Sequence, residues 1–69
     1  MNAKVETNIL KAIACLRDTM EQAKAGRIYN AEDAAAEAAQ ITARVAKALR
    51  EELAQSNREA RERKLKEAA

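Results

Sequence analysis

The chain contains 69 residues with a formal net charge of +2, and it has no histidine, no proline and one cysteine. This inventory excludes the usual zinc, haem and iron–sulfur sites, a histidine-based catalytic triad and an intrachain disulfide. The length suits one small domain. We therefore expect a single domain with no catalytic residues, no metal ligands and no cofactor.

The hydropathy pattern also bears on where the protein acts. No run of about 18 apolar residues is present, so we expect no membrane span and no membrane partner. The N-terminus carries Lys4 but no continuous apolar stretch behind it, which argues against a signal peptide. The expected location is the cytoplasm.

The composition predicts an all-α protein. Eighteen alanines, followed by Glu, Lys, Arg, Gln and Leu, are the strongest helix formers, whereas β-branched and aromatic residues are too few for a sheet. Large apolar residues are scarce: two Val, four Ile, five Leu and two Met. Because so few apolar side chains leave a lone chain marginally stable, we expect it to associate with another copy of itself.

One interruption divides the chain into two predicted helices. Gly26 suits the left-handed residue that ends a helix, and Asn30 suits the N-cap of the next one. The sequence predicts helix one over about 3–25, a turn over 26–30 and helix two over about 31–66. So short a link favours an antiparallel hairpin.

Each predicted helix carries an apolar stripe at spacings of three and four residues, as expected for amphipathic helices. In helix one the stripe consists of Val5, Ile9, Ile13, Leu16 and Met20. In helix two it consists of Ala34, Ala38, Ile41, Val45, Leu49 and Leu53. We predict that two hairpins form a homodimeric four-helix bundle with these stripes in its core.

Helix two is longer than its partner, so residues 55–69 form a charged overhang. There the apolar stripe fades, and five positive side chains face three negative ones. Pairs of opposite charge four residues apart can support a helix in this segment, although it cannot form a core. Whether it is ordered without a partner is left open.

Few side chains suggest chemistry. The neighbouring carboxylates Glu32–Asp33 and Glu51–Glu52 point about 100° apart on a helix, so they serve as solvated surface or caps and do not share a proton. Cys15 lies beside the helix-one stripe without a histidine to activate it, and an inert or interface role is favoured over an exposed reactive thiol or an intermolecular disulfide.

Two places are candidates for binding a partner. Tyr29, the one aromatic residue, lies beside Arg27 at the hairpin tip, where it serves either as a hydrophobic staple onto Ala34 or as a recognition residue. The overhang carries Arg58, Arg61 and Arg63, whose interleaved glutamates favour a solvated helix over a docking arm or a nucleic-acid contact.

Two known kinds of small protein resemble this arrangement. Residues 3–54 resemble in architecture the plasmid-encoded Rop family, whose hairpins pair into a four-helix bundle and bind RNA, although their seam is more regularly heptad. The length, the hairpin centred on residues 26–30 and the missing chemistry are similar to a phage anti-quorum-sensing family. That resemblance implies binding to a host LuxR-type transcription activator and to a pilus assembly ATPase.

We therefore expect a non-enzymatic protein-binding module, an anti-activator of the phage type that binds a host transcription regulator or another host protein. The alternative is a Rop-like or basic-arm regulatory protein that binds RNA or DNA. Steep loss of affinity with salt would accompany the second activity.

Overall fold

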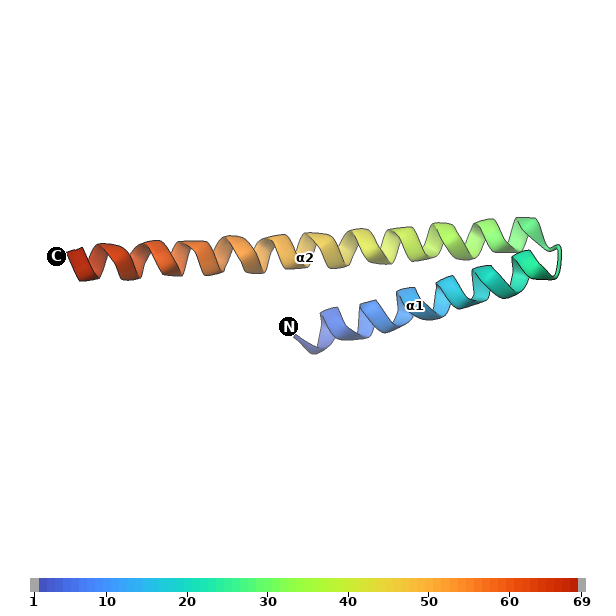
Figure 1. Ribbon diagram of the computed structural model, residues 1–69, viewed down its shortest axis with the longest axis horizontal. Coiled ribbons are helices and arrows are strands. Elements are labelled where there is room, and N and C mark those ends of the chain that lie inside the picture. The colour runs from blue at the N-terminus through green and yellow to red at the C-terminus, as the bar shows by residue number, and fades with distance from the viewer. Residues whose placement is uncertain (1, 69) are drawn as a thin grey trace.

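The computed structural model describes residues 2–68 as two antiparallel helices, α1 over Ala3–Lys24 and α2 over Ile28–Ala68. Figure 1 shows α2 running on alone past the start of α1, so the molecule is a rod of 65 × 17 × 13 Å. The all-helical hairpin predicted from the composition and the Gly26 break is confirmed. The predicted domain limits at residues 1 and 69 lie outside the described residues.

Specific hydrogen bonds fix both ends of α1. At the start, the Asn2 side-chain oxygen accepts the backbone N–H of Val5 at 2.8 Å, which satisfies one of the unpaired donors of the first turn. At the end, Gly26 has φ of 79°, the left-handed conformation predicted for it. The N–H groups of Gly26 and Arg27 donate to the carbonyls of Ala23 and Gln22, the paired bonds of a Schellman motif.

The turn is shorter than the sequence predicted. Because the Schellman motif reverses the chain within three residues, α2 already begins at Ile28, and the Ala31 N–H donates to the Arg27 carbonyl at 3.0 Å. The prediction of Asn30 as N-cap is therefore wrong, since Asn30 lies inside the first turn of the helix. A staple from Tyr29 to Ala34 is not formed either, because Tyr29 is helical and 79% exposed.

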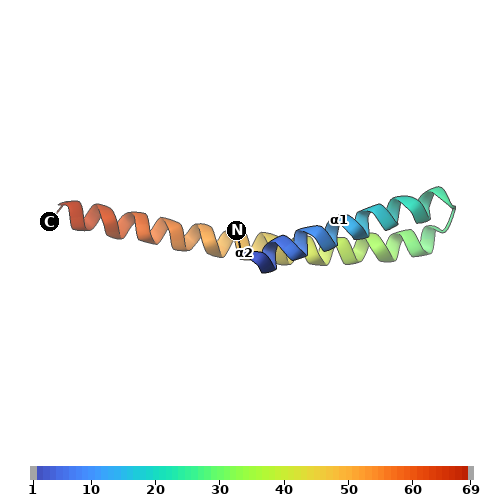
Figure 2. The same ribbon diagram turned by 90° about the horizontal axis from the view of Figure 1, so that it is seen from below.

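The two helices meet along a narrow seam, in which buried and half-buried residues recur at alternating spacings of three and four. The α1 side of the seam consists of Val5, Asn8, Ala12, Cys15, Thr19 and Gln22. The α2 side consists of Ala31, Ala34, Ala38, Ile41, Val45 and Ala48. The seam ends where α1 begins, so residues 52–68 of α2 have no helix beside them within the part of the chain that the structure describes (Figures 1 and 2).

Small and polar side chains dominate this seam. Among residues 2–68, four of the six buried hydrophobic residues are alanines, and the other two, Val5 and Ile41, are larger. The hydroxyl of Thr19, which is half-buried, donates to the Cys15 carbonyl at 2.9 Å, so it needs no partner on α2. The close approach of the helices therefore comes from small residues, and little large apolar surface is removed from water.

Candidate interaction surfaces

The larger apolar residues of α1 lie beside the seam instead of in it. Ile9, Ile13, Leu16 and Met20 each directly follow a seam residue, which turns them about 100° away from α2. Ile9 is half-buried, whereas Leu16 and Met20 are more than half exposed. Of the stripe predicted for helix one, Val5 alone is buried in the single chain.

The same displacement occurs on α2. Leu49 and the alanines at 35, 39 and 46 each directly follow a seam residue, and Leu53 continues this line into the helix beyond α1. Leu49 is 40% exposed and Leu53 is 61% exposed. Of the other predicted core residues, Ala34, Ala38 and Ile41 are buried and Val45 is half-buried.

These two lines of residues lie on one face of the hairpin. A two-fold axis perpendicular to the plane of two antiparallel helices exchanges them, so residues that follow the seam on either helix point to the same side of that plane. We call this surface the apolar face. Its large members are Ile9, Ile13, Leu16, Met20, Leu49 and Leu53.

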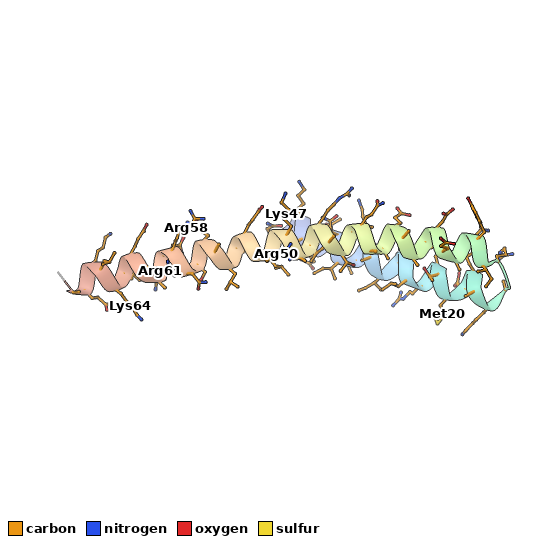
Figure 3. The ribbon with its side chains drawn as sticks, turned by 90° about the horizontal axis from the view of Figure 1, so that it is seen from above. Met20, Lys47, Arg50, Arg58, Arg61 and Lys64 are labelled. Atoms are coloured by element: carbon orange, nitrogen blue, oxygen red, sulfur yellow. The ribbon has the colours of Figure 1, made fainter. Side chains whose placement is uncertain are left out.

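The opposite side is the polar face, formed by residues that directly precede a seam residue. Two shallow grooves cross both helices there, and Figure 3 shows Lys47 on the other side of the hairpin from Met20. The groove near the tip measures about 470 Å³ and contains Asp18, Asp33 and Glu37. The groove near the N-terminus measures about 340 Å³ and contains Lys4, Arg44, Lys47 and Glu51.

Cys15 is a free thiol in the groove near the tip. Desolvation raises the pKa of this thiol above its ordinary value of 9.0, and the nearby carboxylates Glu37 and Asp18 raise it further. A raised pKa keeps the sulfur protonated at neutral pH, and the thiol is a poor nucleophile in that form. The geometry thus favours a seam residue over a reactive cysteine.

The candidate binding residues fall into separate places. At the tip, Tyr29 is exposed, and Arg27 donates through Nε to the Gln22 side-chain oxygen, which holds its guanidinium against the turn. On the overhang, Arg58 and Arg61 lie on the outer side of α2, whereas Arg63 points about 140–160° away from them. The three overhang arginines predicted as one set therefore do not form one surface.

Sequence reasoning missed two residues of the outer side of α2. Lys47 and Arg50 lie on the same side of the helix as Arg58 and Arg61, although they belong to the part that packs against α1 (Figure 3). Their spacing of eleven residues from Arg58 and Arg61 is three helical turns, and this period is the signal that could have found them.

Within residues 2–68, no helix has the length and apolar character needed to cross a bilayer. The same residues contain no group of three or more potential metal-binding side chains. Compared with known proteins, the chain matches no family model, no curated protein and no solved structure.

Proposed function

We propose that the protein is a non-enzymatic interaction module that pairs with a second copy of itself through the apolar face and binds a further protein in that form. The observation that carries the proposal is the separation of the two faces. One side of the hairpin collects isoleucine, leucine and methionine, and the other collects carboxylates, lysine and arginine. Contiguous exposed apolar surface of this kind marks interaction sites.

A second copy is the occupant that the stability of the chain favours. The seam buries two large apolar side chains, whereas the apolar face holds six that are half-buried or exposed. Each of them stabilises the fold by roughly 1.5–3 kcal/mol when it becomes fully buried. Another copy of the chain is present whenever the protein is made, so it can bury these side chains as soon as they are exposed.

The dimensions of the face suit such a pair. The 22 residues of α1 extend about 33 Å, and the hairpin is 17 Å across. Covering this outline on two copies removes on the order of 1,000 Å² from water, which is about the minimum expected of a biological interface. The small alanines at 35, 39 and 46 on this face leave room for the larger apolar side chains of the second copy. The product is a four-helix bundle with the polar faces outward.

Paired substitutions of leucine test the dimer. In Leu16→Glu/Leu49→Glu, two charges enter the apolar face, and we expect the pair to dissociate and lose most of its helix signal. The matched control is Leu10→Glu/Leu65→Glu, which makes the same chemical change at exposed leucines off that face. It should keep the mass of a dimer in sedimentation equilibrium at about 50 µM. A folded wild-type monomer at that concentration, or equal dissociation of both variants, would contradict the proposal.

The partner class comes from the resemblance to phage anti-activators. We propose that the dimer acts in the host cytoplasm as an inhibitor of a LuxR-type transcription activator. The tip supports this role, because Tyr29 and Ile28 are exposed side by side and Tyr is enriched at binding hot spots. Copurification with a purified activator of this class tests it, with Tyr29→Ala expected to weaken capture and Leu10→Ala as a control. If the protein fails to bind such activators, the proposed partner is wrong, whereas the proposal of a dimer is unaffected.

A further inference from the structure

The outer side of α2 carries a row of cations without anions. Within a sector about 120° wide, the helix from residue 46 to residue 68 presents five basic side chains and no carboxylate. We call this row the basic stripe, and Figure 3 labels its members along α2: Lys47, Arg50, Arg58, Arg61 and Lys64. Although the net charge of the overhang is modest, its basic and acidic side chains therefore lie on different sides of the helix.

The glutamates of residues 46–68 lie outside this sector, with Glu51 about 80° and Glu67 about 120° from the middle of the stripe. Glu52, Glu59 and Glu62 continue the positions that face α1 in the hairpin, about 100–180° from the middle of the stripe. Glu59 accepts a hydrogen bond from the Gln55 side-chain amide at 3.2 Å, which holds it along its own side of the helix. A negatively charged partner that approaches the stripe therefore meets the cations first.

The stripe is accessible in the single chain and in a pair. The middle of the stripe faces away from α1 and lies about 80° from the apolar face. Lys64 lies on the line of Leu53 but beyond the part of α2 that packs against α1, so pairing over that part leaves the stripe uncovered. Beyond residue 51 no second helix lies beside it (Figures 1 and 2). Residues 52–68 thus form a free rod about 25 Å long, which we call the arm.

We propose that the basic stripe binds the phosphate backbone of double-stranded DNA, with the arm lying in the major groove. Five cations along about 25 Å match a linear polyanion, which presents a negative charge every 1.7 Å of duplex axis, about fifteen along the stripe. A single helix is about 10–12 Å across and fits a major groove about 12 Å wide. The deep, narrow groove of duplex RNA does not admit it.

Other anionic partners fit the stripe less well. An anionic membrane surface calls for large apolar side chains beside the cations, and Leu65 is the one such residue in the sector. Single-stranded nucleic acid is held by stacking on aromatic rings, and residues 46–68 contain none. Contacts to phosphate alone carry no sequence information, so binding is independent of DNA sequence.

Fluorescence anisotropy with a labelled 24-base-pair DNA duplex tests the inference in the full-length protein. Arg58→Glu/Arg61→Glu reverses two charges on the stripe, and Arg63→Glu/Lys66→Glu reverses two charges on other sides of the same arm. Because the net charge of both variants is identical, any difference reports position. We expect the first to weaken binding by about tenfold or more at 100 mM NaCl and the second to change it by less than about threefold.

The salt dependence and two competitor probes complete the test. Loss of two phosphate contacts should reduce the slope of log affinity against log salt by about 1.8 in the stripe variant. A duplex RNA of equal length should bind more weakly than DNA. Equal loss in both double variants, or no binding by the wild type, would overturn the proposal, as would equally tight binding of polyglutamate. Sedimentation of both variants separates this result from the dimer, which neither should disturb.

Discussion

Two parts of α2 with similar helix-forming residues have opposite environments: the part up to residue 51, which packs against α1, and the arm. In the first part the positions toward α1 are Ala38, Ile41, Val45 and Ala48. In the arm the same positions, continued at spacings of three and four, are Glu52, Gln55, Glu59 and Glu62. The helix is continuous across the boundary, so helix propensity sets its length and side-chain chemistry decides which part packs.

The largest expected effect separates these two parts. Ile41→Asp places a charge at an 8%-exposed position between the helices, and we expect it to lower the free energy of unfolding by about 3 kcal/mol or more. Ala60→Asp makes a similar change on the exposed arm and should leave the urea midpoint nearly unchanged. Circular dichroism during urea unfolding, at one protein concentration, measures both. A similar fall in the free energy of unfolding in both variants would show that the arm is packed against another part of the protein, which would contradict the comparison.

A smaller effect compares two asparagines. Asn2→Ala removes the side chain that caps α1 and should destabilise the hairpin by about 1 kcal/mol. Asn57 lies in the interior of the arm helix, where alanine is the better helix former, so Asn57→Ala should raise helix content without shifting the unfolding midpoint. Thermal unfolding followed at 222 nm distinguishes these outcomes, and stabilisation by Asn2→Ala would contradict the capping role.

The smallest effect compares thiols. Because partial desolvation, Glu37 and Asp18 raise the pKa of Cys15, its thiolate forms at higher pH than that of an ordinary cysteine. A reference thiol comes from Asn57→Cys in a Cys15→Ser background, which places it on the exposed arm. Iodoacetamide should modify Cys15 more slowly at pH 8, and its rate should reach half-maximum at higher pH. Equal profiles would show that the groove does not perturb the thiol.

The sequence predicted the break at Gly26 but not the residue at which α2 begins. Gly26 predicted the break, because few other residues adopt φ of 79° without strain. The start of α2 was misplaced, since the Schellman bond from the Arg27 N–H to the Gln22 carbonyl depends on backbone geometry that a cap-residue pattern does not encode. Asn30 has the right chemistry for a cap but lies three residues too late.

The seam was the harder feature to predict. Ala12 is buried, whereas Ile13 is 41% exposed, which reverses the order that hydrophobicity suggests. A helix with two neighbouring apolar ridges offers two ways to pack, and periodicity alone does not say which ridge meets the partner helix within the chain. Small residues on both helices allow the closest approach, so the alanine ridge forms the seam and the larger side chains are left for association.

Because α2 is one unbroken helix from the hairpin into the arm, its pitch fixes the direction in which the side chains of the arm point relative to the hairpin. Each residue added or removed between Glu52 and Arg58 would turn everything beyond it by about 100° and shift it by 1.5 Å. One deleted residue would carry the outer arginines away from the line of Lys47 and Arg50, whereas eleven inserted residues would restore the alignment and lengthen the reach. The length of the arm and the direction in which its arginines point are therefore coupled through the pitch of α2.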